Sequence, residues 1–295
     1  MTETISIRSD QLSATIAPLG AELQTLRDGQ GRDLLWDGDP AWWTGRAPIL
    51  FPIVGAVAGG VIRVDGRDYP LDKHGFARRR TWTVVAQQET AATFRLEDDA
   101  ETRAQYPFAF RLDLRFAIEG AALSVVATLT NRDARELPAS FGFHPALRWP
   151  LPYGAAKNAH RLTFAHAEPA PIRRIDADGL MRPAPEPSPV VGDTLVPEAR
   201  LFEDDAIIFD RLASREVTFD APGTGGLAIA FPDMSELGIW QKPGAPYLCI
   251  EPWAGHADPE GFTGEFRDKP GVIRLSPGEA RDFTMRIALT EPASA

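Results

Sequence analysis

Strict alternation of apolar and charged residues is the strongest structural signal in this chain. In the segment RLDLRFAI, at 111–118, every second residue is apolar and the residues between are charged or small. A turn signal, Glu119-Gly120, follows, and a second alternating run begins at 122. Because side chains on a strand point to opposite faces in turn, each run predicts a strand with one buried face. Together the two runs predict an antiparallel hairpin.

The same alternation recurs along the chain, with glycine and proline marking the turns between runs. It is clear at 5–7, 12–16, 82–86 and 283–289. No long segment keeps a helical period, and the best helix candidate is short, at 100–105, before Tyr106-Pro107. The pattern therefore predicts an all-β protein, a large antiparallel β-sandwich, and not a parallel α/β sheet. No fixed-period repeat is visible, which disfavours a propeller.

A proline-rich segment, RPAPEPSPV at 182–190, interrupts the alternation. Proline lacks an amide hydrogen and cannot join a central strand, so this segment is expected to be an extended surface loop. A linker between two domains is the alternative. Alternation resumes beyond the segment with no change in composition, so we expect a single domain over residues 1–295.

Charge and apolar content limit the kinds of partner. The net charge of −10 at pH 7 argues against nucleic acid, whose phosphates need a basic face. No segment approaches the ~18 consecutive apolar residues of a membrane span, and the N-terminal MTETISIRSDQ lacks the apolar run of a signal peptide. Cys249 is the only cysteine, so no intramolecular disulfide can form. We therefore expect a cytoplasmic protein without a membrane or nucleic-acid partner.

Motifs for common cofactors and nucleophiles are missing from the sequence. There is no phosphate-binding glycine loop, no dinucleotide fingerprint, no zinc-protease motif and no nucleophilic-serine elbow. Cys249 lies in the apolar run YLCIEPW, which favours a buried structural thiol over a nucleophile. His160 and His166 would share one face of a strand, but no third ligand lies nearby, and His256 is expected in a loop. The sequence therefore predicts no metal and no cofactor.

Three other stretches hold titratable residues in unusual settings. His74 precedes a glycine and several arginines in KHGFARRRTW, His144 ends an aromatic strand in FGFHP, and Glu251 closes the apolar run YLCIE. A carboxyl group in such a place is costly to bury unless it is paired or used in chemistry. From these residues alone, plainer interpretations stay open: an exposed turn for His74, a core histidine for His144 and an exposed strand end for Glu251.

At these stretches the chain resembles the aldose 1-epimerase (galactose mutarotase-like) family, and within it the subgroup of LacX-type proteins and hexose-phosphate mutarotase relatives. The matching segments, in the order found in that subgroup, are WWTGRAPILFPIVG (42–55), HGFARRRTW (74–82), YPF (106–108), FGFHP (141–145) and LGIWQKPGAPYLCIEPWAG (237–255). The resemblance implies a galactose mutarotase-like β-supersandwich. It also implies an enzyme that interconverts the α and β anomers of a free sugar without metal or nucleotide.

The resemblance further implies roles for individual residues. Glu251 matches the family's general base, His144 the acid that protonates the ring oxygen, and His74 a second histidine that hydrogen-bonds the sugar. Arg46 lies at the position of a substrate-binding arginine, and Asp205 corresponds to an aspartate that binds sugar hydroxyls. Opening a cyclic hemiacetal needs one base and one acid with pKa values near neutrality, so a Glu–His pair suits this chemistry.

Basic residues near these stretches are candidates for binding the sugar or a phosphate on it. Arg78 belongs to the H-G-F-A-R pattern of the subgroup. We expect 74–80 to be a strand in which Arg78 faces the ligand and Arg79 faces solvent. Arg46, Arg78 and Lys242 together could surround a phosphate, because the arginine fork matches phosphate oxygens.

Aromatic residues complete the set of candidates. Trp240, Trp43 and Phe76 lie within the matching segments, and their flat rings could stack on the C–H face of a sugar. Each is equally compatible with a place in the hydrophobic core.

Three functions remain open from the sequence. The first is an aldose 1-epimerase acting on a free hexose, with a hexose 6-phosphate as a close variant. The second is a non-catalytic sugar-binding protein on the same fold, although the presence of Glu251, His74 and His144 together favours catalysis. The third is a glycosidase, which needs two opposed carboxylates where only Glu251 lies in a recognisable motif. The expected partner is a small sugar or sugar phosphate, and the oligomeric state is not predicted.

Overall fold

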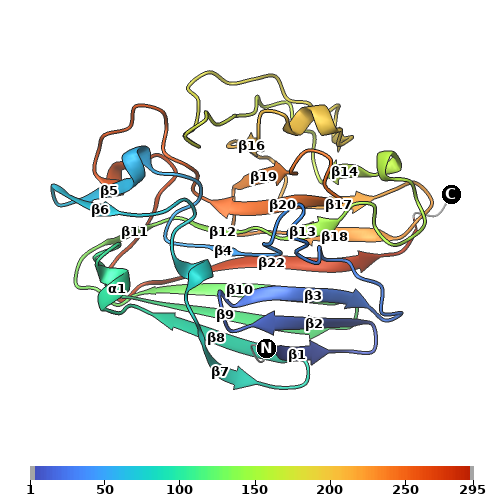
Figure 1. Ribbon diagram of the computed structural model, residues 1–295, viewed down its shortest axis with the longest axis horizontal. Coiled ribbons are helices and arrows are strands. Elements are labelled where there is room, and N and C mark those ends of the chain that lie inside the picture. The colour runs from blue at the N-terminus through green and yellow to red at the C-terminus, as the bar shows by residue number, and fades with distance from the viewer. Residues whose placement is uncertain (1–3, 293–295) are drawn as a thin grey trace.

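The computed structural model describes residues 4–292 of the 295-residue chain, and strands dominate it (Figure 1). The predicted all-β sandwich is confirmed. The strands of the predicted hairpin at 111–129 pair antiparallel, with Val125 opposite Phe116. The longest sheet has nine strands, in the order β15 (Thr194–Leu195), β14 (Arg161–Phe164), β17 (Glu216–Asp220), β18 (Gly226–Ala230), β22 (Ala280–Thr290), β10 (Ala122–Asn131), β9 (Phe110–Glu119), β8 (Ala91–Glu97) and β7 (Thr83–Gln87).

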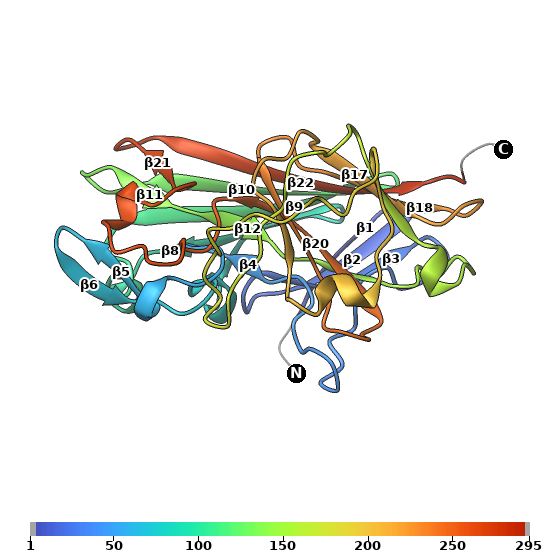
Figure 2. The ribbon, with the colours of Figure 1, turned by 90° about the horizontal axis from the view of Figure 1, so that it is seen from above.

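A second sheet of six strands packs against the first. Its order is β16 (Ile207–Phe209), β19 (Glu236–Trp240), β20 (Tyr247–Ala254), β12 (Phe141–Phe143) and β4 (Ile49–Leu50), with β13 (Ala146–Arg148) also pairing with β20. Figure 2 shows β22 and β10 in one layer and β20 and β4 in the layer beside it. Smaller sheets flank these layers: β1 (Ile5–Arg8) with β2 (Leu12–Ala17) and β3 (Glu22–Asp28), β5 (Val61–Val64) with β6 (Arg67–Pro70), and β11 (Leu137–Ala139) with β21 (Ile273–Leu275).

Helices in the described part of the chain are single turns. The helix predicted at 100–105 is present as α1 (Ala100–Arg103), and Asp99 caps its first turn by accepting a hydrogen bond from the Thr102 amide. The others are 3₁₀ turns: η1 (Ala58–Gly60), η2 (Ala77–Arg79), η3 (Lys157–Ala159), η4 (Ala199–Phe202) and η5 (Phe266–Asp268). Because each helix within residues 4–292 has only three or four residues, none can span a lipid bilayer.

Two local predictions can be compared with the backbone. The proline-rich segment 182–190 is irregular, as expected, and lies between β14 and β16 at the top of Figure 1. The prediction of a strand at 74–80 is wrong. His74 and Gly75 both have a φ of 68°, outside the extended region, and the chain then forms the 3₁₀ turn η2.

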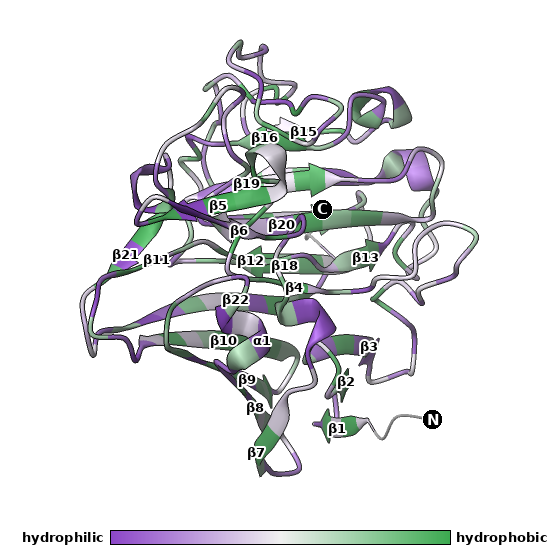
Figure 3. Ribbon diagram, turned by 60° about the vertical axis from the view of Figure 1, so that its left-hand side comes forward, coloured by the Kyte–Doolittle hydropathy of each residue, from purple (hydrophilic) through white to green (hydrophobic). Residues whose placement is uncertain are grey.

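The hydrophobic core lies between the two large sheets. Phe141 of β12 stacks on Phe283 of β22 with ring centroids 4.9 Å apart and planes inclined by 17°. Alternation along β22 sends its other side chains away from the core, and Figure 3 shows the resulting bands of hydrophobic and hydrophilic colour. Apolar contact between opposite faces therefore holds the two layers together.

All eight residues of strand β20 are buried, which makes it the longest fully buried strand within residues 4–292. Leu248 and Ile250 belong to the core between the sheets. Cys249 and Trp253, of the opposite parity, pack in separate apolar clusters on the other face. Glu251 has this second parity, so it projects away from the core, to the face on which a cavity lies.

The aromatic contact between the layers gives a prediction for stability. Replacement of Phe283 by alanine, Phe283→Ala, should lower the free energy of unfolding by about 3–5 kcal/mol, because a fully buried ring is removed and a cavity remains. Urea unfolding followed by circular dichroism measures the change. Val85→Ala on edge strand β7 is the control: Val85 is 42% exposed, so its loss should stay within about 0.5 kcal/mol. Equal losses in the two variants would contradict this account of the core.

Candidate active site

A cavity of about 230 Å³ opens on the outer face of the six-stranded sheet. It is smaller than the roughly 300–1,000 Å³ of sites for drug-sized ligands, so it suits a small molecule. Six of the eight residues predicted for the site line it: His74, Arg78, His144, Asp205, Trp240 and Glu251. The other lining residues are Trp43, Val54, Gly55, Lys73, Ile175, Gly179, Ala206, Ile208, Trp253 and Ala257.

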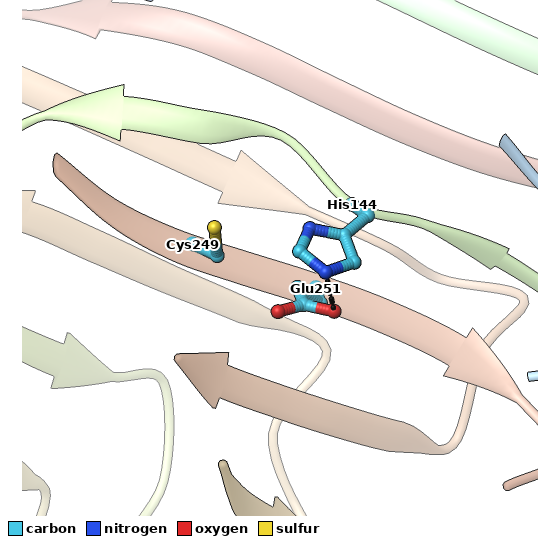
Figure 4. A group of neighbouring side chains, drawn as sticks. All are labelled: His144, Cys249 and Glu251. Carbon is cyan, nitrogen blue, oxygen red and sulfur yellow. Dashed lines mark ion pairs between the residues drawn. The ribbon is translucent and has the colours of Figure 1, made fainter. Parts of the chain in front are cut away.

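Glu251 and His144 form a direct contact at this cavity (Figure 4). Glu251 projects from β20, and His144 follows β12, where Phe143 points into the core and the next residue points out. Nε2 of His144 lies 3.2 Å from Oε2 of Glu251. Both side chains are at least nine-tenths buried. A carboxyl group and an imidazole are therefore held within proton-transfer distance at the edge of a cavity.

Burial shifts the pKa values of this pair in opposite directions. Burial raises the pKa of Glu251 well above its ordinary value, and the Asp205 carboxylate adds to the rise. Burial, with smaller contributions from the charges of Arg78 and Lys73, lowers the pKa of His144 to about 3. Both shifts favour the uncharged forms, a protonated Glu251 next to a neutral His144.

A tight turn brings His74 to the cavity. His74 and Gly75 both have positive φ, and a Cβ on Gly75 would lie 2.2 Å from the carbonyl oxygen of Phe51. That same oxygen accepts hydrogen bonds from the amides of Phe76 and Ala77. Glycine at 75 is therefore required by both backbone angle and space, and the turn aims the preceding imidazole at the cavity.

The backbone of Gly55 determines which nitrogen of His74 carries a proton. The Gly55 amide donates to Nδ1 of His74 over 3.1 Å, and the His74 amide donates to the Gly55 carbonyl over 2.8 Å. Because Nδ1 accepts a hydrogen bond, a neutral His74 carries its proton on Nε2. Burial, the neighbouring His144 and the charges of Arg78 and Lys73 lower the pKa of His74 well below 6.5. His74 therefore offers the cavity a hydrogen-bond donor.

Aromatic rings form the floor and one wall of the cavity. Trp253 of β20 lies between glycines on the two neighbouring strands: a Cβ on Gly142 would come within 2.6 Å of its indole and one on Gly238 within 2.4 Å. On the other side, the Trp43 ring lies 5.0 Å from His144 and 5.5 Å from Trp240. Flat apolar surfaces next to polar groups suit the C–H faces of a sugar.

The turn η2 separates the arginines of the RRR run. Arg78 lines the cavity, and its Nη2 donates to the carbonyl of Lys73 over 2.8 Å. Arg79 forms an ion pair with Asp72 and is exposed. A 3₁₀ turn and not strand parity thus places Arg78 at the cavity and Arg79 at the surface.

Two predicted site residues do not line the cavity. Nη1 of Arg46 donates to the Gln24 carbonyl over 2.7 Å, which ties the Arg46 segment to β3. Nζ of Lys242 donates to the carbonyl of Trp42 over 2.8 Å. Both long side chains instead hold the segment that carries Trp43. The third aromatic candidate, Phe76, belongs to the hydrophobic core.

Lys73 was not identified from the sequence, although it is the first residue of KHGFARRRTW. It lines the cavity with Arg78, and within residues 4–292 neither cation has a carboxylate within salt-bridge distance. Its place next to His74 in the sequence is the signal that could have identified it. The cavity therefore holds two cations that lack an anionic partner in the described structure.

One group of buried side chains at the cavity has the residue types of a metal site. Donor atoms of His144, Cys249 and Glu251 lie within 4.8 Å of one another. Burial and the nearby Glu251 raise the pKa of the Cys249 thiol well above its ordinary value, which opposes the thiolate that a metal needs.

The strand expected to carry both His160 and His166 begins at Arg161 and ends at Phe164, so the two histidines do not share a strand face. His160 instead accepts the Leu151 amide.

Comparison with known proteins agrees with the fold. The architecture is that of the galactose mutarotase-like β-sandwich proteins. A galactose mutarotase-like protein from Lactobacillus casei superposes with a TM-score of 0.90 at 28% identity, covering 97% of this chain and all of that one. A putative aldose 1-epimerase from Escherichia coli K12 shares the fold with a TM-score of 0.73 at 16% identity, covering 98% of this chain and 99% of that one.

Sequence comparison defines the family. The family model for aldose 1-epimerase matches residues 3–287, so the chain belongs to the aldose 1-epimerase family. The chromosomal protein LacX from Lactococcus lactis is 29% identical over 284 residues, which cover 93% of this chain and 95% of LacX.

The hydrogen bond from Gly55 gives a prediction for His74. At pH 6 an ordinary histidine, with a pKa of 6.5, is mostly protonated. His74 should remain neutral there, with its proton on Nε2, because its lowered pKa lies below this pH. Two-bond ¹H–¹⁵N spectra of histidine-labelled protein distinguish the two tautomers and the charged ring, and His74→Asn assigns the signal. A charged ring at pH 6, or a proton on Nδ1, would contradict this arrangement.

Proposed function

We propose that the protein is an aldose 1-epimerase that interconverts the α and β anomers of a free hexose. The observation that carries the proposal is the 3.2 Å contact between Glu251 and His144 at the wall of a small cavity. Membership of the aldose 1-epimerase family supports it. One base and one acid, placed together, are the groups that the opening of a cyclic hemiacetal requires.

The reaction consists of two proton transfers and one bond rotation. The Glu251 carboxylate removes the proton from the C1 hydroxyl, the C1–O5 bond breaks, and the His144 imidazolium gives its proton to O5. The open-chain aldehyde turns about its C1–C2 bond. Closure on the other face of the carbonyl returns both protons, so the reaction balances without any cofactor.

The pKa shifts of the pair suit this cycle. Transfer of one proton from Oε2 of Glu251 to Nε2 of His144 converts the uncharged pair into the carboxylate and imidazolium that begin the reaction. After ring opening, Glu251 holds the proton and His144 is neutral. This is the arrangement that burial favours for each group. Ring opening therefore removes the two charges that burial disfavours.

His74 and the tryptophans serve binding in this proposal. His74 donates through Nε2–H to a sugar oxygen and, with Nδ1 already accepting from Gly55, cannot act as the base. Trp43, Trp240 and Trp253 offer apolar surfaces to the ring. Asp205 is placed to accept from a sugar hydroxyl, since its carboxylate lies close enough to raise the pKa of Glu251.

A hexose 6-phosphate is the second candidate substrate. The observation in its favour is the pair of cations, Lys73 and Arg78, which line the cavity and lack a carboxylate partner within residues 4–292. Burial and the neighbouring Arg79 charge lower the pKa of Arg78, and the more distant carboxylates of Asp72 and Glu22 offset only part of this. Arginine recognises phosphate through paired hydrogen bonds. This pair replaces the set of Arg46, Arg78 and Lys242 inferred from the sequence.

Polarimetry separates these substrates and tests catalysis itself. Fresh α-anomers of glucose, galactose and glucose 6-phosphate should mutarotate faster with the protein than without it. A non-catalytic sugar-binding protein would bind one of these sugars in calorimetry and leave the spontaneous rate unchanged.

Glu251→Gln tests the assigned base. The catalysed rate should fall at least ~10²-fold, because general-base catalysis supplies about 10²–10⁴-fold. Stability should not fall. The raised pKa of Glu251 contributes stability below its unfolded pKa of 4.5, and this contribution is lost as pH rises through the folded value. Glutamine does not ionise, so the variant does not lose stability in this way as pH rises. Its thermal midpoint at pH 7 should therefore equal or exceed that of the wild type. A folded variant with wild-type turnover would remove Glu251 from the mechanism.

Arg78→Ala, with Arg79→Ala as its matched control, tests the phosphate. If glucose 6-phosphate is the substrate, Arg78→Ala should raise its KM by about 10- to 150-fold, the equivalent of about 1.5–3 kcal/mol for charged hydrogen bonds. The KM for glucose should rise only about 5-fold, for roughly 1 kcal/mol. Arg79 pairs with Asp72 at the surface, so its variant should leave both constants unchanged. A larger effect at Arg79 would contradict the placement of these side chains.

A further inference from the structure

Four ionisable side chains are buried together behind the cavity, and the proposed reaction uses none of them. Glu236, His256, Asp258 and Lys269 are each at most 7% exposed. Nζ of Lys269 lies 3.3 Å from Oδ1 of Asp258, and Nε2 of His256 lies 3.9 Å from Oε1 of Glu236. Burial raises the pKa of Glu236 to about 8 and lowers that of His256, so Lys269 and Asp258 are the charged pair of this cluster. A buried ion pair has a large desolvation penalty, so this one calls for a role.

Asp258 is the member of this cluster that reaches the cavity segment. Its Oδ2 accepts a hydrogen bond from the Ala58 amide over 2.9 Å, and its own amide donates to the Ala56 carbonyl over 2.9 Å. One residue thus holds both ends of 56–58. Since Asp258 is only 4% exposed, its carboxylate depends on the Lys269 ammonium as counter-charge. Without that cation the buried carboxylate would have no counter-charge, and its bond to Ala58 would weaken.

Segment 56–58 is connected to His74 through Gly55. Gly55, the preceding residue, packs on Ala257 so closely that a Cβ on Gly55 would lie 2.5 Å from the Cβ of Ala257. Gly55 in turn exchanges two hydrogen bonds with His74, one from its amide to Nδ1 and one from the His74 amide to its carbonyl. A continuous series of contacts therefore joins the buried ion pair to the imidazole at the cavity.

We propose that Lys269 and Asp258 are positioning residues, whose buried ion pair fixes segment 55–58 and thereby aims Nε2–H of His74 at the ligand. The place of His74 at a sugar rests on the proposed function. The series of contacts from Lys269 to His74 does not depend on it.

Lys269→Met tests the pair, because methionine keeps much of the side chain and removes the charge. The KM for the sugar should rise about 10-fold, the value of one misplaced hydrogen bond, while kcat stays within about 2-fold. The ¹⁵N signals of His74 should lose the pattern of an Nδ1 acceptor. Asp258→Asn should reproduce both effects, and Lys269→Arg, which restores the charge, should recover a large part of each.

Lys157→Met is the control for a general loss of stability. Lys157 donates to the Ala245 carbonyl over 2.7 Å and lies over the Trp149 ring, but it does not line the cavity. Its variant should be less stable, with unchanged KM and unchanged His74 signals. If Lys157→Met moves the same signals, the effect of Lys269→Met is not positional and the proposal is rejected.

The remaining outcomes separate this proposal from the proposed function. Wild-type KM and wild-type His74 signals in folded Lys269→Met and Asp258→Asn would overturn the proposal. So would failure of both variants to fold, since the pair would then serve the fold as a whole. A wild-type protein without epimerase activity would reject the proposed function, and the His74 signals would still decide whether the ion pair positions that ring.

Discussion

The carboxyl group of Glu251 lies on a strand with no exposed residue, and much of the surrounding structure accommodates this fact. Water cannot solvate the group, so it must be neutral or face a partner. His144 is that partner, 3.2 Å away, and it is available because Pro145 follows it and the chain leaves β12 there. The Asp205 carboxylate pushes the pKa of Glu251 up while the Lys73 ammonium pulls it down. Burial is the largest of these effects, so the pKa of Glu251 stays well above its ordinary value.

The two histidines show how burial and position divide one residue type into two tasks. Both have lowered pKa values. His74 has one nitrogen engaged by the backbone of Gly55, so only a donor is left for the cavity. His144 faces a carboxyl group, so its nitrogen can either accept or give a proton. The distinction comes from their neighbours, because the rings are chemically identical.

Much of this arrangement follows from sequence pattern, and the failures have physical causes. Alternation identified the strands because most strands bury one face. The site roles of Glu251, His144 and His74 came from the family resemblance, because the residue pattern alone left plainer interpretations open for each of them. The strand prediction at 74–80 was wrong, because the positive φ angles of His74 and Gly75 interrupt the extended backbone. Arg46 and Lys242 were misplaced, since a long flexible side chain can reach a nearby carbonyl as easily as a ligand. The roles of the site residues stay predictions until the variants are measured.

The floor of the cavity depends on two glycines, whose lack of a side chain leaves space for a tryptophan. Trp253 lies where it does because Gly142 and Gly238, on the strands at either side, leave room for its indole. A methyl group at either position would push the ring outward and make the cavity shallower. The size of sugar that this scaffold admits can therefore change through positions that never touch the sugar. An evolving or engineered lineage could narrow its selectivity there while its acid, base and hydrogen-bond donors stay unaltered.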